Sequence, residues 1–449
     1  MFKKIVIANR GAVAARLVET LASMNVASVA LYSEADANLP YVAKADESLL
    51  IGPGPAPQSY LNQDAVLEAA IKTGADAIHP GYGFLAENDQ FAEKVIAAGL
   101  SFIGPDPKWL KIMGDKTASK EMMAAEGFPI SPSTGILTGE IEDQARQAAA
   151  LGFPLLIKPA GGGGGIGMTS VFEESKLAAA IESASKLAAR SFGRPALYAE
   201  RLLENPRHVE FQIVADRHGN AVHLFERDCS TQRRRQKVVE EAGAPNIPAE
   251  ELAAMADRAA SAMRRLGYDH LGTVESLYSP GDGFSFLEVN PRLQVEHGVT
   301  EEITGLDLVK IQIKLAAGES VDQALPHRPK APQGHAVEAR IYAEDPVKFF
   351  PSPGPLKVFR PPQGKGVRVE TGFCEGAVVT PFYDPMIAMV IVHAETRPAA
   401  LDLMHDALGD FAVEGIKTNI PFVRDLMKYG PFREGRVHTG IADEYFAAK

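Results

Sequence analysis

The chain has 449 residues, enough for two or three domains with a sizeable buried core. Hydrophobic residues make up 46% and charged residues 23%, as in ordinary globular proteins, and the net charge of -11 argues against a nucleic-acid partner. Two cysteines are too few for a disulfide framework or a Cys-rich zinc site, and no run approaches the roughly 18 apolar residues of a membrane span, so we expect a cytoplasmic protein.

Short apolar strands alternate with helices at the start of the chain. This alternation predicts a parallel sheet with helices on both faces, and such sheets bind ligands beyond the carboxyl ends of their strands. Two short segments lie there, 9–11 and 79–83, although a plain turn explains either one equally well. The expected strands are 3–8, 26–32, 75–79 and 100–105, and the expected helices are 12–24, 59–74 and 86–99.

A glycine run follows a helix expected at 108–127 and a strand that ends at Lys158. Residues 161–165 are five consecutive glycines, which cost backbone entropy when they are ordered. Such a run suits backbone N–H groups that approach phosphates, or a flap that moves. The pattern is neither a P-loop nor a dinucleotide fingerprint, and a flexible linker is the alternative. Lys158, three residues before the run, favours a nucleotide site.

A basic run, RRRQK at 233–237, comes next and is followed by Glu240 and Glu241. A solvated charge run is the usual interpretation of such a pattern. The strand-like flank and the paired glutamates favour an ordered anion site instead. The surrounding elements are expected to be a helix, a strand, a long hairpin and a further helix, at 174–190, 196–203, 208–228 and 249–266.

The stretch 286–301, FLEVNPRLQVEHGVTE, carries polar residues at alternate positions. On an extended strand they share one face, which is costly to bury unless something charged binds there. Neighbours in the row are about 7 Å apart, so we divide it into a metal end and an anion-handling end. A solvated strand face is the alternative. The row consists of Glu288 and Asn290 at the metal end and Arg292, Gln294 and Glu296 at the anion end.

The segment before this row reads as strand, turn, strand around the sequence PGDG. If Ser279 pairs with Phe284, then Glu275 falls opposite Glu288. Facing carboxylates would lie about 5 Å apart and repel each other. A divalent cation removes this conflict, and Mg²⁺ prefers carboxylate and phosphate oxygens. The hairpin therefore predicts a magnesium site.

The last quarter of the chain has a different texture, which begins at about residue 335 after a helix expected at 300–318. Short strands with Pro/Gly turns and one helix at 401–415 predict a smaller, β-rich domain. Arg340 lies on one of these strands with Glu338 on the same face, where a structural ion pair is the alternative to a functional role.

Together these motifs resemble the biotin carboxylase family of ATP-grasp enzymes, over about residues 3–445. The resemblance implies an α/β and α+β architecture: an N-terminal parallel α/β domain at 1–114, a central ATP-grasp domain at 115–334 with a glycine-rich lid at about 130–203, and a C-terminal β-rich domain at 335–449. The motifs that carry it occur in the family's order: ANRG, HPGYGFLAEN, FIGP, MGDK, KPAGGGGGIGM, ENPRHVEFQ, ERDCSTQRRRQKVVEEA, EVNPRLQVEH, ITGLDLVK, GHAVEARIYAEDP and GIKTN.

The chemistry that the resemblance implies begins with ATP and bicarbonate, which give carboxyphosphate, and ends with transfer of CO₂ to N1′ of biotin. The implied cofactors are ATP, Mg²⁺ (or Mn²⁺) and biotin carried on a separate protein. The residues implied for ATP are Lys116, Lys158, Gly163, Gly164, Gly165, Glu200, Leu203, His208 and Gln232, and those for the metals are Glu275, Glu288 and Asn290. Those implied for bicarbonate, biotin and catalysis are Tyr82, Lys237, Arg292, Gln294, Val295 through its backbone, Arg340, and Glu296 as the base.

The sequence departs from the family pattern at positions that leave the implied metal, bicarbonate and base residues intact. We expect a carrier and carboxyltransferase subunits as partners, because no biotinylation motif precedes Lys449, and we also expect a homodimer. Two alternatives stay open: an ATP-grasp ligase with another acceptor, and a non-catalytic ATP-binding subunit. The departures are Ala12, Ile166, Arg201, Arg235, Gly243, Pro291, Gly298, Pro385, Ala388 and Met389.

Overall fold

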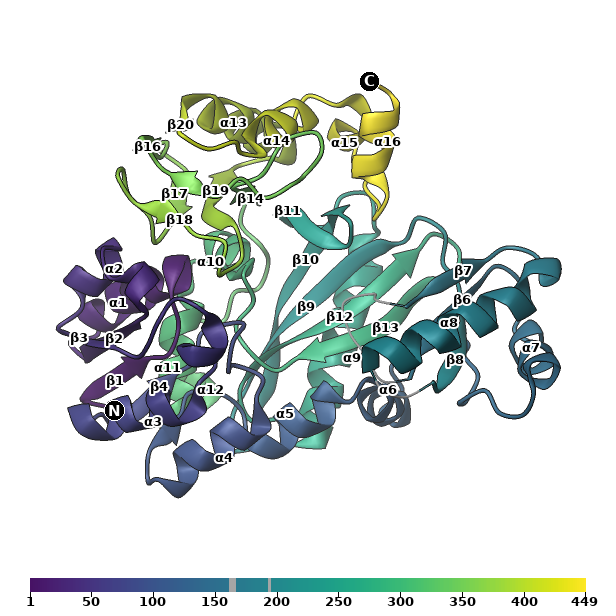
Figure 1. The fold of residues 1–449 in the computed structure, drawn as a ribbon, viewed down its shortest axis with the longest axis horizontal. Coiled ribbons are helices and arrows are strands. Elements are labelled where there is room, and N and C mark those ends of the chain that lie inside the picture. Colours follow the sequence, from purple (N-terminus) through teal and green to yellow (C-terminus); the bar gives the residue numbers. More distant parts are fainter. Residues whose placement is uncertain (161–166, 193–194) are drawn as a thin grey trace.

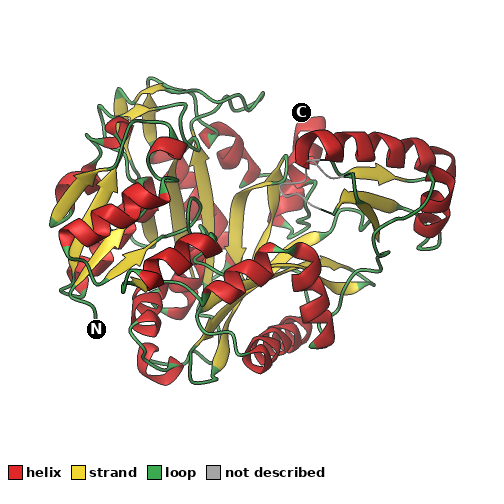
Figure 2. Cartoon of the chain, turned by 60° about the horizontal axis from the view of Figure 1, so that its bottom comes forward, coloured by secondary structure: helices red, strands yellow, loops and turns green. Residues whose placement is uncertain are grey.

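The computed structural model describes residues 1–160, 167–192 and 195–449. Figure 1 shows an N-terminal unit in purple and blue, a central sheet in teal and green, and C-terminal helices in yellow at the top. A small unit built around β6, β7 and β8 projects from the side of the central sheet in both Figure 1 and Figure 2. The glycines expected to contact ATP, 163–165, lie outside the described residues.

The N-terminal unit is the predicted parallel sheet, with strand order β3-β2-β1-β4-β5. The β3 strand was not foreseen, because it is an exposed edge strand without alternating burial. The helix expected at 59–74 begins later, since the Asn62 side chain accepts a hydrogen bond from the N–H of Ala65 and caps it. The elements are β1 (Lys4–Ile7), α1 (Gly11–Ser23), β2 (Ala27–Tyr32), α2 (Pro40–Lys44), β3 (Glu47–Leu50), α3 (Gln63–Thr73), β4 (Ala77–His79), α4 (Asp89–Ala97), β5 (Ser101–Phe102) and α5 (Pro107–Gly114).

The projecting unit is a three-stranded antiparallel sheet, in the order β7-β6-β8, that packs against two helices. Its own apolar cluster includes Leu155, Ile157 and Ile181, so it has a core separate from that of the central sheet. The unit and the helix that leads into it comprise α6 (Lys116–Ala125), α7 (Ile141–Ala149), β6 (Leu155–Pro159), β7 (Thr169–Val171), α8 (Leu177–Phe192) and β8 (Leu197–Arg201).

The central sheet has eight strands in the order β13-β12-β9-β10-β11-β14-β19-β17, all paired antiparallel. Helix α9 covers one face through a cluster with Phe211, Met263 and Val274. The central elements are β9 (Arg207–Ala215), β10 (Ala221–Arg233), β11 (Gln236–Ala242), α9 (Ala249–Leu266), β12 (Leu271–Ser279), β13 (Gly283–Asn290), α10 (His297–Thr304), α11 (Leu308–Ala316) and α12 (Val321–Ala324).

The β-rich C-terminal part shares this sheet with the central part, because β14 pairs with β11. Side chains at the junction of the two parts can therefore face each other directly across paired strands. The C-terminal elements are β14 (His335–Tyr342), β15 (Gly354–Pro355), β16 (Val358–Arg360), β17 (Val367–Glu370), β18 (Val378–Val379), β19 (Met386–Ala394), α13 (Arg397–Asp410), β20 (Ala412–Glu414), α14 (Ile420–Leu426), α15 (Gly430–Arg433) and α16 (Ile441–Ala447).

Two predicted helices are each split in the structure. The helix expected at 108–127 divides at Asp115, whose carboxylate accepts hydrogen bonds from the N–H groups of Thr117 and Ala118 and caps α6. The helix expected at 300–318 divides at Gly305, whose φ of 68° ends α10 in the left-handed region. Within the described parts of the chain, no helix is both long and apolar enough to cross a membrane.

Candidate active site

Lys237 lies at the centre of a group of buried carboxylates on the central sheet. Its Nζ is 2.6 Å from Glu296 Oε1, 2.7 Å from Glu210 Oε2 and 3.0 Å from Glu275 Oε1. All three glutamates are at most 3% exposed. One ammonium group thus bridges three strand or loop segments, and any change in charge at one carboxylate is transmitted to the other two.

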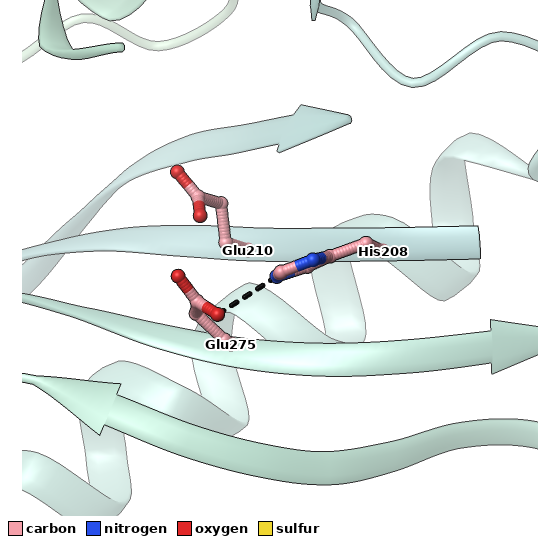
Figure 3. A group of neighbouring side chains, drawn as sticks. All are labelled: His208, Glu210 and Glu275. Atoms are coloured by element: carbon pink, nitrogen blue, oxygen red, sulfur yellow. Dashed lines mark ion pairs between the residues drawn. The ribbon is translucent and has the colours of Figure 1, made fainter. Parts of the chain in front are cut away.

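The strand β9 supplies two of the groups beside this cluster. Figure 3 shows His208 and Glu210 on β9 and Glu275 on the neighbouring β12, with their side chains directed toward one another. His208 and Glu210 are two residues apart, so they share a face of the strand. His208 Nε2 is 2.8 Å from Glu275 Oε2, in an ion pair whose angles are too bent for a hydrogen bond.

The hairpin register predicted from the turn is confirmed at the position that matters. Glu275 pairs with Glu288 across β12 and β13. The turn itself is one residue out of the predicted register, because Ser279 pairs with Gly283 rather than Phe284. A β-bulge beyond Glu275 restores the alignment and brings the two carboxylates onto opposite positions.

The prediction of one long strand through Glu296 is wrong. The strand β13 ends at Asn290, and Glu296 is the N-cap residue of α10. Pro291 follows Asn290 and has no N–H to extend the ladder, which is a physical reason for the strand to end there. The polar side chains nevertheless converge: Asn290 Nδ2 and Gln294 Nε2 donate to the same oxygen, Glu275 Oε1, at 2.8 and 3.0 Å.

Arg292 is held by groups from two units. Its Nη1 donates to Gln294 Oε1 at 2.9 Å, and its Nη2 makes a longer contact of 3.4 Å with Asn290 Oδ1. Its Nε donates to Glu87, which comes from the N-terminal unit just before α4. The guanidinium is 20% exposed, so it can still reach an anion that enters from solvent.

Arg340 connects a second pair of glutamates. Its Nε donates to Glu240 Oε1 at 2.6 Å and its Nη2 to Glu296 Oε2 at 2.8 Å. Glu296 is therefore held between Lys237 and Arg340, one at each oxygen. The ion pair with Glu338 that strand alternation suggested does not form, because neither oxygen of Glu338 has a hydrogen-bond partner among the described residues.

The charge state of Glu296 follows from these contacts. Burial alone would raise its pKa, but Lys237, Arg340 and Arg227 outweigh burial and hold the pKa of Glu296 well below its usual value. Burial also opposes the charged form of Lys237, yet Cys229 and the surrounding glutamates raise the pKa of Lys237 well above its usual value. The cluster therefore presents an ionised carboxylate to any substrate that reaches it.

The residues expected to contact a nucleotide lie toward the projecting unit. Glu200 accepts from Lys158 at 2.8 Å and from Lys120 at 2.7 Å, and Lys116 Nζ is 3.0 Å from Glu288 Oε2. Burial alone would lower the pKa of Lys158, but Glu200 raises it, so the ammonium stays charged. Two of these lysines contact Glu200 and the third contacts Glu288, and phosphates are expected in this region.

Other expected residues fall in the same region or at the far end of the cluster. Gln232 Nε2 is 2.9 Å from His208 Nδ1, and Leu203 follows β8. Val295 lies between Gln294 and Glu296, and its carbonyl faces the ring of His297. Tyr82 is half-buried, and its hydroxyl has no hydrogen-bond partner in the described part of the chain.

The two turns at the edge of the parallel sheet meet each other. The Asn9 side chain donates to the carbonyls of Pro80 at 2.7 Å and of Tyr82 at 2.8 Å. Asn9 is 2% exposed, so these bonds fix the 79–83 turn against β1.

The basic run at 233–237 does not form one continuous patch. Arg233 pairs with Glu344 at 2.6 Å, while 234–235 form the turn between β10 and β11.

The donor set at Glu275, Glu288 and Asn290 fits a divalent cation. Two facing carboxylates and an amide oxygen are the ligands that Mg²⁺ prefers. Glu288 is 30% exposed at its side chain, and Asn290 Oδ1 has only the long contact with Arg292, so both keep acceptor capacity. The group of His208, Glu210 and Glu275 shares Glu275 with this donor set, and the Lys237 ammonium lies against both of its carboxylates. Glu275 would have to accept a cation in addition to Lys237 in either place, so Glu288 and Asn290 are the residues that favour the first set.

Sequence reasoning missed several members of this site. Arg227 is fully buried and donates to Glu210 at 2.5 Å and to Gln212 at 2.8 Å, so it fixes the position of the Glu210 carboxylate beside Lys237. The alternation of His208, Glu210 and Gln212 along β9 is a signal that could have revealed Glu210. Glu87 carried no such signal, because only the packing of the N-terminal unit brings it to Arg292.

Three family models match the chain. The model described as "Biotin carboxylase, N-terminal domain" matches residues 1–110, "Carbamoyl-phosphate synthase L chain, ATP binding domain" matches 115–324, and "Biotin carboxylase C-terminal domain" matches 338–444. The biotin carboxylase of Halalkalibacterium halodurans is 46% identical over 449 residues, which is 100% of this chain and 99% of that protein. The chain belongs to the biotin carboxylase family.

The chain is also similar to a pyruvate carboxylase subunit and to a solved biotin carboxylase structure. A pyruvate carboxylase subunit from Methanothermobacter thermautotrophicus is 46% identical over 446 residues, 99% of this chain and 90% of that protein. A crystal structure of Campylobacter jejuni biotin carboxylase in a β,γ-ATP complex superimposes with a TM-score of 0.94 at 38% identity, covering 99% of both chains.

A second structure carries further ligands of the family. The biotin carboxylase domain dimer of Hydrogenobacter thermophilus 2-oxoglutarate carboxylase, with MgADP, ADP and bicarbonate, gives a TM-score of 0.92 at 41% identity over 99% of this chain and 98% of that one. The ATP-grasp fold expected from the motifs is therefore confirmed. The division at residues 114 and 334 stays a prediction.

Proposed function

We propose that this protein is an ATP-dependent biotin carboxylase that phosphorylates bicarbonate and passes CO₂ to biotin on a separate carrier. The observation that carries the proposal is the placement of Glu296 between Lys237 and Arg340, at 2.6 and 2.8 Å. An ionised carboxylate inside a cationic frame is suited to remove a proton from a bound acid and then to hold the product anion nearby.

The chemistry needs ATP phosphates held against a metal and three positive side chains. Lys158 and Lys120 contact Glu200 and Lys116 contacts Glu288, and the three ammonium groups neutralise charge that develops on the transferring phosphoryl group. Glu275, Glu288 and Asn290 would hold Mg²⁺, and the bound ion would supply Lewis-acid stabilisation of the same group. His208 Nδ1 and Gln232 Nε2 lie 2.9 Å apart, and we expect both side chains to contact the nucleotide.

Bicarbonate occupies the space between Arg292 and Lys237. Arg292 gives a planar pair of N–H donors that suits a carboxylate-like anion, and Gln294 fixes its orientation through Nη1. Glu296 takes the proton, and the oxygen so freed attacks the γ-phosphorus of ATP. The bond from the γ-phosphorus to the β,γ-bridging oxygen breaks, so that carboxyphosphate forms and ADP leaves. Arg340 then lies next to the position where the anionic form of the acceptor must be stabilised, with Tyr82 at the rim.

The proposed partners follow from the same chemistry. We place the acceptor biotin on a carrier protein, and we expect carboxyltransferase subunits and a homodimer. The pyruvate carboxylase and 2-oxoglutarate carboxylase relatives support a place in a multi-subunit carboxylase. The carboxylase would act on an acyl-CoA or a 2-oxoacid, and we expect the partners rather than this chain to select that final substrate.

Purified protein tests the proposal directly. With Mg²⁺, ATP, bicarbonate and free biotin, we expect ADP release that requires both bicarbonate and biotin. Hydrolysis that is independent of biotin but stimulated by another amine or carboxylate would contradict the acceptor. Tight ATP binding without turnover, even with a biotinylated carrier supplied, would contradict catalysis altogether.

A further inference from the structure

Two buried glutamates face each other next to Arg340. Glu240 on β11 and Glu338 on β14 are directly paired across the strands, and each is 0% exposed. Side chains at such positions start about 5 Å apart. Neither residue was placed among those expected to contact nucleotide, metal or bicarbonate.

The hydrogen bonds of this pair are incomplete. Arg340 Nε donates to Glu240 Oε1 at 2.6 Å. Glu240 Oε2 and both oxygens of Glu338 are buried and have no partner among the described residues. Two ionised carboxylates in this state would be severely destabilised, because an unpaired buried charge is far costlier than a neutral polar group. One proton shared by the two carboxyl groups would remove one of the two charges and give Glu240 Oε2 a donor.

The surroundings keep water away from Glu338. Ile391 on β19 is its partner across the strands, and the Ile391 Cδ1 lies within the space that a Cβ on Gly298 would need. Glu338 Oε2 lies 3.4 Å from the position of that Cβ. The absence of a side chain at Gly298 therefore lets Ile391 pack beside the carboxyl group.

Among the residues that the structure describes, no cation forms an ion pair with Glu338. Arg340 is already shared by Glu240 and Glu296. The carboxylate of Glu370 on β17 also faces Glu338, but it is paired with other cations. The titratable and charged groups near Glu338 on the neighbouring elements are Glu240, Arg340, Glu296, Glu370 and Tyr82, and the side chains that contact Glu370 are Arg16, Arg368 and His297.

We propose that Glu338 is a positioning residue that stays a neutral carboxylic acid, donates its proton to Glu240, and through Glu240 holds Arg340 against Glu296. The proposal rests on the function proposed above. The structure holds two links of a chain that ends at the base, because Arg340 Nε donates to Glu240 Oε1 and Arg340 Nη2 donates to Glu296 Oε2. The proposed proton on Glu338 would add the first link, to Glu240 Oε2. A donor at Glu338 is needed to complete that chain.

Burial supports the neutral form. It raises the pKa of Glu338 well above its usual value, and Glu240 raises it further. Burial likewise raises the pKa of Glu240, to about 7, against the opposing effect of Arg340. At alkaline pH the loss of the shared proton leaves two anions competing for Arg340, which draws the guanidinium away from Glu296. Turnover should therefore fall as the pH rises above the pKa of the Glu240–Glu338 pair, because Arg340 moves and not because a reacting group changes its charge.

A matched pair of variants separates the proton donor from the volume of the side chain. Glu338→Gln keeps a donor at every pH, whereas Glu338→Leu fills similar space without one. We measure kcat and KM for bicarbonate-dependent ATP hydrolysis from pH 6 to 9.5 in both variants. Wild-type kcat should fall up to about tenfold per pH unit above the pKa of the pair, and Glu338→Gln should lose much less over the same range.

Glu338→Leu should have a kcat about tenfold lower at pH 7, the size of one lost hydrogen bond to a charged group, with an unchanged KM for ATP. The inference is overturned if Glu338→Gln shows the wild-type pH profile, or if it loses kcat at pH 7 as Glu338→Leu does. Either result would mean that Glu338 acts as an anion or only fills space.

An infrared difference spectrum gives a readout that does not depend on turnover. The carbonyl stretch of a protonated carboxylic acid should be present in the wild-type protein at pH 7 and absent in Glu338→Gln. If the wild-type protein lacks bicarbonate-dependent hydrolysis, the proposed function fails, yet this measurement still decides the protonation of Glu338. An unchanged band in Glu338→Gln would refute the neutral acid.

Discussion

Replacing Lys237 by Met would leave three buried carboxylates without their shared cation. In the native structure Nζ lies within 3.0 Å of Glu210, Glu275 and Glu296, and the lysine side chain is 14% exposed. The methionine fills similar space, so lost charge rather than lost volume dominates the effect. We expect the variant to fold, to be destabilised, and to lose bicarbonate-dependent turnover.

The magnitude can be worked from the remaining contacts. Removing one partner of a buried ion pair typically costs about 3–5 kcal/mol. Each carboxylate here keeps one other cationic neighbour, because Arg227 contacts Glu210, Arg340 contacts Glu296 and His208 contacts Glu275. The expected loss is therefore at the lower end, about 3 kcal/mol in the free energy of unfolding at pH 7.

The pH dependence of this loss has a definite sign. Burial alone would raise the pKa of Glu296, but Lys237 outweighs burial and holds the pKa in the folded protein well below its ordinary 4.5. A lowered carboxylate pKa contributes stability that is present above 4.5 and is lost as pH falls through the folded pKa. The difference between Lys237→Met and wild type should thus be full at pH 7 and should shrink below pH 4.5.

Urea unfolding measures this difference, followed by the fluorescence of Trp109, the single tryptophan, which packs against Tyr268. The matched control is Lys94→Met, which removes an exposed lysine 3.0 Å from Asp64 and should cost less than about 1 kcal/mol. A Lys237→Met protein that is no less stable than the Lys94→Met control would refute the reasoning, as would a difference that grows as pH falls.

Three further predictions concern single carboxylates. Glu296→Gln should abolish bicarbonate-dependent turnover while the Kd for ATP is unchanged, since it removes the base but no phosphate contact; isothermal titration with ATP would contradict this if binding were lost. Glu288→Gln should raise the Mg²⁺ concentration for half-maximal activity by about tenfold or more, and an unchanged Mg²⁺ titration would argue against a metal ligand there. Burial alone would raise the pKa of Glu241, but Arg397 and His335 lower it to about 2, from 4.5. Glu241→Gln should therefore cost about 3 kcal/mol at pH 7, a loss that disappears as pH falls from 4.5 toward 2; a pH-independent loss in urea unfolding would contradict the ion pair.

The site could be predicted from the sequence where its geometry is local. Strand alternation and the turn predicted Glu275 opposite Glu288, and the structure has this pair, although the turn is one residue out of the predicted register and a β-bulge makes up the difference. The same reasoning failed beyond Asn290, where alternation continues in the sequence but the strand does not. Gln294 still reaches Glu275, through a loop conformation that no periodicity describes.

Contacts between distant segments could not be read in this way. Glu87 meets Arg292 across 205 positions, and Glu240 meets Arg340 across 100. Such pairs depend on how whole units pack, and a carboxylate that ends beside a cation has the same local sequence as one that faces solvent. Only the packing of the folded chain decides which carboxylates lie beside a cation and which face solvent.

Sequence by itself determined the class of the fold, the family, and the residue types available for phosphate, metal and anion binding, because those depend on local periodicity and on motifs at fixed spacing. Tertiary structure decided which charges are paired. It joined the C-terminal strands to the central sheet through β11 and β14 and so brought Glu240 and Glu338 face to face. The physical reason is that the free energy of a charged group depends on its burial and its neighbours, and both arise only when distant strands come together.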